Sequence, residues 1–342
     1  MSVSEFCVGV SHDCYAELEG KFENHLETKL GGLSVVPMPA TPRLDEYDAI
    51  FALGTRVTAE VLPHAERLAV IARWGVGYDL IDTDALTRAD VALAITPNAV
   101  RRPVAEAIYA LIFALSTNLL AQDRVVRQGH WRGQLPRLGW NLKNRVLGSL
   151  GFGNIAQEMF SMARSLGFRR LLACDPYGRA DVAKFLGVEL VDQEQLFTQA
   201  DYLTVNTPLM PSTRGLVDAS RLRLMKPTAF LINTARGPIV NQADLTRALE
   251  ERWIAGAGLD VFEQEPLPAD DRLRQLDNVI LAPHGLAWTE EIARDNTIEA
   301  CDNILAIAAG DVPKAIVNKE VLDRPGFRAK LERYRAARRT QV

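Results

Sequence analysis

Short apolar runs alternate with amphipathic stretches along almost the whole chain. The runs are rich in valine, isoleucine, leucine and alanine and end in turn residues, which is typical of buried parallel strands, whereas the stretches between them have helical periodicity. This alternation predicts an α/β protein with parallel sheets. The predicted strands form a first block at 6–10, 35–38, 49–53, 68–73 and 91–96, and a second block at 145–150, 171–175, 202–206, 229–233, 256–260 and 279–282.

The two blocks predict two doubly wound domains, of which the second is inserted into the first. Helical patterns are expected at 15–30, at about 103–129 and at 289–309. Pro103 is expected in the first turn of the middle helix, where proline is well placed. Because both chain ends then belong to one domain, we expect residues 1–98 and 288–342 to form the first domain and residues 99–287 the inserted one.

Composition and charge narrow the choice of partners. The length of 342 residues, with 48% hydrophobic and 24% charged residues, predicts a folded chain of two domains. A formal charge of -4 provides no cationic field for a phosphate backbone, so nucleic acid is not expected as a partner. The basic segment 324–339, whose only acid is Glu332, is expected to be a solvated C-terminal helix or tail rather than a docking site.

The cysteines, the N-terminus and the most apolar stretch indicate in which compartment the protein is expected and whether it spans a membrane. The four cysteines are scattered without the spacing of a disulfide framework or a zinc site, so we expect no metal and a reducing compartment, the cytoplasm. The N-terminus lacks the basic start and apolar run of a signal peptide. The uncharged stretch 107–122 is shorter than the ~20 apolar residues of a spanning helix, so we expect a buried helix and no membrane.

A glycine motif joins the first strand of the second block to the helix after it. The motif is Gly151-x-Gly153-x-x-Ala156, in which the first glycine permits a tight turn, the second lets a pyrophosphate approach, and the small third residue lets helix and strand pack closely. The next strand ends at Asp175, whose carboxylate favours the ribose hydroxyls of NAD over the 2′-phosphate of NADP. Arg179 lies close enough to leave that preference open. A plain α/β turn would also use glycines, but the strand, helix and acid around the motif predict NAD.

Three later strand ends carry the polar residues Arg236, Glu265 and His284. Carboxyl ends of parallel strands meet at one edge of a sheet, so these side chains can converge on a bound nicotinamide. A ketone that accepts hydride needs a cation to polarise its oxygen and an acid to protonate it, which Arg236 and His284 supply. Glu265 beside His284 would favour the imidazolium. Each residue taken singly has a structural alternative to a catalytic role. Arg236 could tie a surface loop, Glu265 could cap a turn, and His284 could be a hydrogen-bonded histidine of the core.

Together these motifs resemble the D-isomer-specific 2-hydroxyacid dehydrogenase family over essentially the whole chain. The resemblance rests on RWGVGYDLID at 73–82, TPN at 96–98, VAE at 104–106, the glycine motif, NTPL at 206–209, INTARG at 232–237, GLDVF at 258–262 and APH at 282–284. It implies two Rossmann-like domains with a cleft between them, an NAD-binding domain inserted into a flavodoxin-like substrate domain, and a homodimer formed through the helix after Pro103.

The resemblance also implies the site residues. The catalytic set is Arg236, Glu265 and His284. The cofactor-binding set is Gly151, Gly153, Asn154, Ile155, Asp175, Thr207, Pro208, Thr234, Ala235, Asp260 and His284, with Asp260 holding the nicotinamide carboxamide. The substrate-binding set is Gly75, Val76 and Gly77, which offer backbone N–H groups to the substrate carboxylate, together with Arg236 and Trp288.

Several positions depart from the family pattern. Ala156 replaces a third glycine and should be harmless, whereas Asn206 stands where histidine is frequent and Asn154 where a basic residue is frequent. Trp288 stands where small residues are usual, and it either roofs the substrate cleft or packs at the start of the last helix. Arg101 and Arg102 either bind a second acidic group on the substrate or lie in a solvated hinge or against the cofactor.

We therefore expect an NAD-dependent oxidoreductase that interconverts a D-2-hydroxy acid and its 2-oxo acid. Two alternatives remain. One is a 3-phosphoglycerate dehydrogenase of the short type, because the chain ends soon after the last family helix. The other is a dinucleotide-sensing binding module similar to the C-terminal binding protein corepressors, which share the site.

Overall fold

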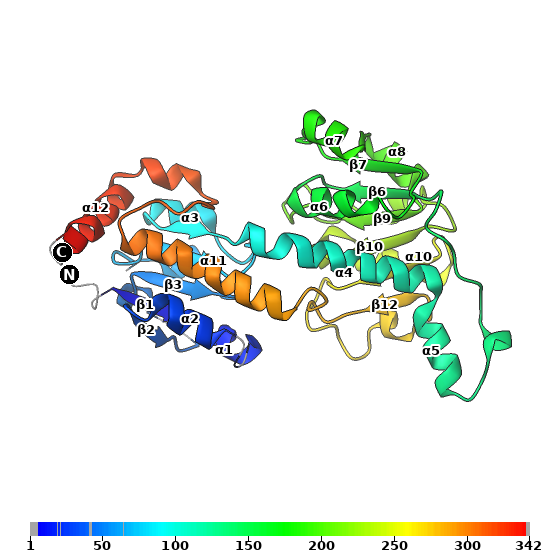
Figure 1. Ribbon diagram of the computed structural model, residues 1–342, viewed down its shortest axis with the longest axis horizontal. Coiled ribbons are helices and arrows are strands. Elements are labelled where there is room, and N and C mark those ends of the chain that lie inside the picture. The colour runs from blue at the N-terminus through cyan, green and yellow to red at the C-terminus, as the bar shows by residue number, and fades with distance from the viewer. Residues whose placement is uncertain (1–5, 19, 21, 41–42, 64, 340–342) are drawn as a thin grey trace. The chain divides into compact units, whose positions relative to one another are not determined.

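The computed structural model describes residues 6–18, 20, 22–40, 43–63 and 65–339. The chain divides into two compact units: the first consists of Met1–Val100 and Trp288–Val342, and the second of Arg101–Ala287. The breaks predicted from the sequence lie after residues 98 and 287. Figure 1 shows the elements of each unit, and each unit is described here by itself.

The first unit is built on a five-stranded parallel sheet in the order β2-β1-β3-β4-β5. Its strands are β1 (Cys7–Val10), β2 (Ser34–Pro37), β3 (Ala49–Ala52), β4 (Val70–Arg73) and β5 (Ala92–Ala94). This is the flavodoxin-like strand order, in which a ligand binds beyond the carboxyl ends of the strands. After the second unit the chain returns to this unit through helix α11 (Glu290–Ala308), which packs on β3 and β4 and against α2 (Figure 1).

The second unit is built on a seven-stranded parallel sheet in the order β12-β11-β10-β9-β6-β7-β8. Its strands are β6 (Val146–Leu150), β7 (Arg170–Cys174), β8 (Glu189–Leu190), β9 (Tyr202–Val205), β10 (Phe230–Asn233), β11 (Gly256–Leu259) and β12 (Val279–Leu281). All strands are parallel, but successive strands are added in one direction from β6 to β8 and in the opposite direction from β9 to β12. A Rossmann-type fold binds its dinucleotide at this switch point, between β6 and β9. The two-residue strand β8 is not predicted by the sequence, because it is too short to carry a pattern.

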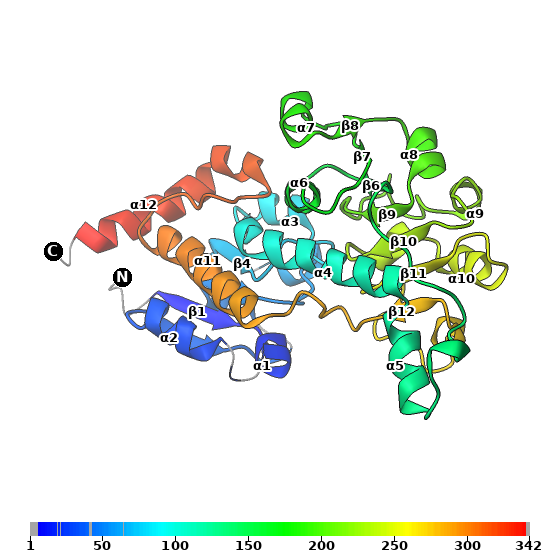
Figure 2. The ribbon, with the colours of Figure 1, turned by 45° about the vertical axis from the view of Figure 1, so that its right-hand side comes forward.

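Apolar clusters cover both faces of this second sheet. On one face the strands pack with α8 (Gln193–Gln199) and α10 (Gln242–Glu250). On the other face they pack with residues 105–115 of α4, with α6 (Asn154–Ala163) and with α7 (Ala180–Leu186), and Figure 2 shows these helices around the sheet. The predicted fold class, two doubly wound parallel-sheet units, is therefore confirmed.

Two of the predicted helices are wrong in their bounds. The pattern at 15–30 is two helices, α1 (His12–Leu18) and α2 (Glu23–Leu30), and Gly20 between them has a φ of 69°, outside the helical range. The middle pattern is also two helices, α4 (Pro97–Thr117) and α5 (Leu119–Arg127), separated by Asn118 in the left-handed region with a φ of 58°.

The first turn of α4 is therefore Pro97 and its neighbours, and Pro103 lies inside the helix rather than in its first turn. Within the described residues no single helix is long and apolar enough to cross a membrane, although α4 and α5, bent by 59°, would reach that length and apolarity together. Among the same residues no group of three or more His, Cys, Asp or Glu side chains could hold a metal ion.

The basic C-terminal segment forms the helix α12 (Pro325–Arg339). The sequence predicts a solvated helix or tail, whereas one face of α12 is buried. Phe327 and Tyr334 are buried, and the Lys330 ammonium donates to the backbone carbonyls of Leu68, Ala89 and Asp90 at 2.7, 3.2 and 3.0 Å. Burial lowers the pKa of Lys330 to about 8. One face of the helix is thus a structural part of the first unit.

Candidate active site

Most of the predicted site residues of the second unit follow the carboxyl end of a strand. Because all strands of the sheet are parallel, these ends lie along one edge. The residues are Gly151 after β6, Asp175 after β7, Thr207 and Pro208 after β9, Thr234 to Arg236 after β10, Asp260 and Glu265 after β11, and His284 after β12. The topology therefore gathers residues that are far apart in the chain.

The glycine loop has the features that a dinucleotide requires. Gly151 has a φ of 102°, and a Cβ there would lie 2.6 Å from the backbone oxygen of Asn206, so only glycine fits. Helix α6 begins after Gly153, which provides no side-chain cap for the first amides, Asn154 and Ile155 among them. Uncapped N–H groups at a helix start, with the helix dipole behind them, are ready to bind a diphosphate.

Asp175 is tied to this loop by one carboxylate oxygen and to its own turn by the other. One accepts the N–H of Phe152 at 2.7 Å and the other accepts the N–H of Tyr177 at 2.8 Å. Each oxygen keeps a lone pair for a further donor, such as a ribose hydroxyl. Arg179, which could instead favour a 2′-phosphate, is paired with Asp181 at 2.6 Å on the surface. These contacts fit NAD.

Arg236 lies in a turn that Asn233 builds. The buried Asn233 side chain accepts the N–H of Ala235 at 3.1 Å and donates to the carbonyl of Arg236 at 3.0 Å. The next residue, Gly237, packs so closely on the backbone of Phe262 that an added Cβ would lie 1.9 Å from its carbonyl group. Sequence reasoning missed Asn233, although its place in the Asn-Thr-Ala-Arg-Gly motif was visible.

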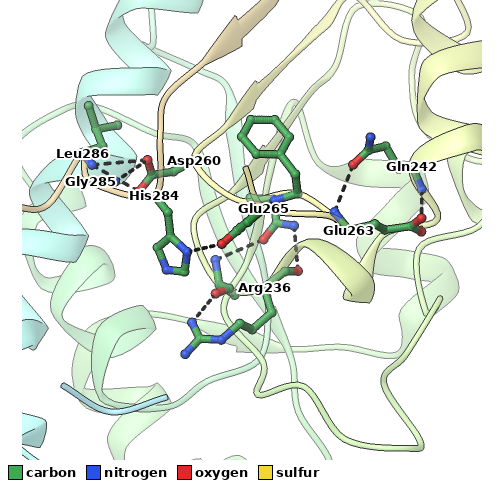
Figure 3. A network of polar contacts seen from close by, with 11 residues as sticks. Arg236, Gln242, Asp260, Glu263, Glu265, His284, Gly285 and Leu286 are labelled. Atoms are coloured by element: carbon green, nitrogen blue, oxygen red, sulfur yellow. Dashed lines mark hydrogen bonds and ion pairs between the residues drawn. The ribbon is translucent and has the colours of Figure 1, made fainter. Parts of the chain in front are cut away.

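His284 and Glu265 form a direct pair. Nδ1 of His284 lies 2.7 Å from Oε2 of Glu265, while Oε1 of Glu265 accepts the N–H of Phe262 at 2.9 Å. A carboxylate only accepts, so Nδ1 carries a proton and Nε2 is left for a substrate. Figure 3 shows the imidazole meeting Glu265 and the guanidinium of Arg236 extending to the same side of the loops in this view.

Opposing effects act on the Glu265 carboxylate. Burial by itself would raise its pKa, but the hydrogen bonds from His284 and Phe262 and the charges of His284 and Arg236 outweigh burial. The net pKa of Glu265 therefore lies below its ordinary value, and the carboxylate is charged at neutral pH. A charged Glu265 stabilises a protonated His284.

Asp260 holds the turn that presents His284. Its carboxylate accepts the N–H of Gly285 at 3.1 Å and the N–H of Leu286 at 3.2 Å (Figure 3). Burial raises the pKa of Asp260, and these N–H groups act in the opposite direction. The structure thus assigns Asp260 a contact with the protein in addition to the carboxamide contact expected from the family.

A second anchor fixes the loop between Asp260 and Glu265. Gln242, the first residue of α10, and Glu263 exchange two hydrogen bonds of 3.0 Å between side chain and backbone (Figure 3). The Gln242 side chain also donates to Asp271 at 2.8 Å. Sequence reasoning missed Gln242, and no motif signal pointed to it.

In the first unit, the loop after β4 contains the predicted Gly75, Val76 and Gly77. The N–H of Gly75 donates to the hydroxyl of Thr96 at 2.7 Å, and the carbonyl of Gly75 accepts the N–H of Thr96 at 3.1 Å. The Gly75 amide is therefore engaged within the first unit, whereas the resemblance implies that it is offered to the substrate carboxylate. Within the described part of the chain, the N–H groups of Val76 and Gly77 have no hydrogen-bond acceptor.

Trp288 packs on the residue that begins this loop. Its ring meets the ring of Trp74 edge-on, with 6.0 Å between centroids and 72° between planes. Trp74 is buried and its indole N–H donates to Thr297 at 3.1 Å, whereas Trp288 keeps 41% of its surface exposed. Trp288 therefore packs against the protein just before helix α11, which is one of the two alternatives given for it above. Part of its side chain is still exposed to solvent.

The remaining departures from the family pattern have partners inside their own unit. Arg101 and Arg102 both pair with Glu158, at 3.2 and 3.3 Å, and Arg102 also pairs with Glu106 at 2.6 Å. Asn206 donates to the hydroxyls of Ser149 and Thr204, each at 2.9 Å, and so ties the ends of β6 and β9 together. These contacts give both arginines a structural role as cations paired within the protein.

Comparisons with known proteins agree with this geometry. Residues 109–285 match the family model described as D-isomer specific 2-hydroxyacid dehydrogenase, NAD binding domain. The chain is 37% identical over 315 residues to a glyoxylate reductase of Korarchaeum cryptofilum, covering 90% of this chain and 95% of that protein.

Solved structures are similar as well. A protein of Thermus thermophilus superimposes with a TM-score of 0.80 at 30% identity, covering 91% of this chain and 99% of that one. The holo form of the D-mandelate dehydrogenase of Rhodotorula graminis superimposes with a TM-score of 0.80 at 26% identity, covering 93% of this chain and 98% of that one.

Proposed function

Because the chain belongs to the D-isomer specific 2-hydroxyacid dehydrogenase family, we propose that it reduces a small 2-oxo acid to the D-2-hydroxy acid, and catalyses the reverse, with His284 as the acid and base. It is an NAD-dependent 2-hydroxyacid dehydrogenase. The observation that supports the assignment of His284 most directly is its 2.7 Å pair with Glu265, in a loop that follows the nucleotide-binding strands.

The protein groups divide the chemistry between them. When bound, NADH supplies the hydride that C2 of the oxo acid accepts. Arg236 polarises the carbonyl oxygen, and the proton on Nε2 of His284 moves to that oxygen as the C–O double bond becomes single. Glu265 stabilises the imidazolium before transfer and keeps the ring oriented through Nδ1. In the oxidation direction, neutral His284 takes the hydroxyl proton back.

The other groups hold the two reactants. The amides of Val76 and Gly77 bind the substrate carboxylate, which needs donors and meets two N–H groups that lack acceptors in the described part of the chain. The glycine loop with Asn154 and Ile155 binds the diphosphate, and Asp175 the ribose hydroxyls. Thr207, Pro208, Thr234 and Ala235 would hold the nicotinamide end of the cofactor, and Asp260 would accept a hydrogen bond from its carboxamide.

Trp288 selects among oxo acids by their side chains. Its ring rests on Trp74, two residues before Val76 and so near the proposed carboxylate site, and 41% of its surface is exposed. An aromatic face at that position restricts the volume next to C2 and favours small or flat side chains.

The chain acts as a homodimer in the cytoplasm, where its four free cysteines stay reduced. Helices α4 and α5 and the segment after them expose large apolar side chains that a monomer would leave in water. These are Phe113, Leu119, Leu120, Val126, Trp131 and Leu138, between 44% and 83% exposed. A second copy of the chain is the partner that would cover them.

A substrate panel tests the function. NADH absorbance is followed with glyoxylate, hydroxypyruvate, pyruvate, branched and aromatic oxo acids, and phosphohydroxypyruvate, and chiral analysis of the product checks for the D form. Turnover of a small oxo acid such as glyoxylate is expected. A clear preference for phosphohydroxypyruvate would favour a 3-phosphoglycerate dehydrogenase, and tight NADH binding without turnover would favour a dinucleotide-sensing module.

A further inference from the structure

We propose that Arg73 is a positioning residue that shapes the loop 74–77 into a receptor for the substrate carboxylate; this inference rests on the proposed function. Arg73 is the last residue of β4. Its Nε donates to the carbonyl of Gly77 at 2.9 Å, and its Nη1 donates to the carbonyl of Trp74. One guanidinium thus joins both ends of the loop.

The rest of the loop shows what this bridge achieves. The Gly75 carbonyl accepts the N–H of Thr96, so the carbonyls of Trp74, Gly75 and Gly77 are all held by donors of the first unit. Thr96 is itself fixed, because its hydroxyl donates to the buried side chain of Asn296 at 2.5 Å.

The backbone donors left over are the N–H groups of Val76 and Gly77, for which the described part of the chain offers no acceptor. The carbonyls of Trp74, Gly75 and Gly77 are engaged within the first unit, so the loop offers two adjacent N–H groups beside acceptors that are already occupied. Such a surface prefers an anion to a neutral group.

The chemistry of the guanidinium suits this task better than that of another cation. Its planar fork reaches two carbonyls at fixed angles, and it stays charged at every working pH. A lysine ammonium keeps the charge but is a point donor without the fork. The geometry therefore distinguishes positioning by the fork from simple attraction by a positive charge.

The experiment measures binding of oxamate, an unreactive 2-oxo acid analogue, to the NADH complex of the full-length protein. Quenching of tryptophan or NADH fluorescence gives the Kd for oxamate, and a separate titration gives the Kd for NADH. The variants are Arg73→Met, Arg73→Lys and, as a matched control, Arg328→Met. Arg328 is an exposed arginine of the first unit that also donates to a carbonyl, that of Leu322 at 2.9 Å.

Both Arg73 variants are expected to raise the oxamate Kd and the KM for the oxo acid by about tenfold or more, because a misplaced receptor loses affinity steeply. The kcat and the NADH Kd should change by less than about threefold, since the hydride and proton donors are untouched. Arg328→Met should match the wild type throughout.

An oxamate Kd within twofold of the wild-type value in a folded Arg73→Met variant would overturn the proposal. Full affinity in Arg73→Lys would also overturn it, because charge alone would then suffice. If circular dichroism shows that Arg73→Met is unfolded, Arg73→Lys decides the question. A wild-type protein that neither binds oxamate nor reduces any oxo acid would refute the proposed function itself, a result distinct from unequal variants.

Discussion

Asp260 holds His284 in place through the main chain. The Asp260 carboxylate binds the N–H groups of the two residues after His284, and His284 itself has a φ of 54°, in the left-handed region that non-glycine residues seldom adopt. A strained conformation at a functional residue persists only where its surroundings hold it. The buried carboxylate supplies that hold, and it links the end of β11 to the end of β12.

Replacing this carboxylate is expected to displace the catalytic histidine. In Asp260→Asn the side chain loses its charge, and its NH2 group replaces the oxygen that lies 3.3 Å from the N–H of Leu286, so that two donors meet there. We expect kcat/KM to fall by about tenfold to a hundredfold, because small displacements of a catalytic group are costly. Steady-state kinetics and thermal unfolding check this. Asp277→Asn, at an exposed pair with Arg252, is the control, and equal activities in the two variants would contradict the clamp.

The role of His284 itself is tested best with asparagine, which tolerates the left-handed conformation better than alanine does. His284→Asn should lower kcat by at least about a hundredfold, the usual contribution of general acid–base catalysis. NADH binding, measured by fluorescence, should stay within a few fold of the wild type. The exposed His130 gives the control variant His130→Asn. Retained turnover in His284→Asn would remove the histidine from the mechanism.

Glu265 predicts a pH effect whose sign follows from its lowered pKa. A carboxyl group whose pKa is lowered by folding stabilises its ion pair fully at any pH above its ordinary pKa. This stabilisation is lost as the pH falls through the lowered pKa. At neutral pH the charge is present and stabilises imidazolium.

Without the charge of Glu265, the protonated form of the catalytic imidazole is less stable and is present only at lower pH. The alkaline limb of kcat against pH for oxo-acid reduction should therefore move to lower pH in Glu265→Gln. Glu251→Gln, at an exposed pair with Arg247, should leave the profile in place. A profile unchanged in Glu265→Gln would show that the pair does not govern proton transfer.

Trp288 predicts a change in substrate ranking rather than in rate alone. Trp288→Ala removes the exposed face beside the loop 74–77, so branched and aromatic oxo acids should gain in kcat/KM relative to glyoxylate. Gains of about tenfold are reasonable, since one or two methylene groups in a pocket are worth ~1–3 kcal/mol each. Trp288→Phe should keep most of the original order. The same ranking in all three proteins would leave Trp288 with a packing role only.

The exposed apolar segment predicts the oligomeric state. Leu138, 83% exposed, lies in the segment that we propose a second copy covers. Leu138→Glu should shift the mass measured by light scattering from a dimer toward a monomer, because a charge would be buried without a partner. Phe185→Glu, at a residue 75% exposed on α7, should leave the mass unchanged. A wild-type protein that is already monomeric would refute the dimer.

Much of the fold was predictable because its determinants are local. Buried parallel strands need continuous apolar runs, and the runs that end at Leu150, Val205 and Asn233 are visible without coordinates. The glycine motif and the strand ends carrying Arg236 and His284 follow from the same rule, since parallel strands bring their carboxyl ends to one edge. The prediction of one helix at 15–30 is wrong for an equally local reason, because Gly20 has a φ outside the helical range.

The contacts that decide how each group is used lie far apart in the sequence. The order of residues indicated that Gly75, Val76 and Gly77 belong to a loop, but only the fold brings Thr96 to the Gly75 amide and offers the next two amides no acceptor among the described residues. Likewise, the sequence alone determined that a histidine and a glutamate follow neighbouring strands. Tertiary packing decided that they meet at 2.7 Å and that Asp260 holds the turn after His284, because hydrogen-bond geometry depends on distances that no local pattern encodes.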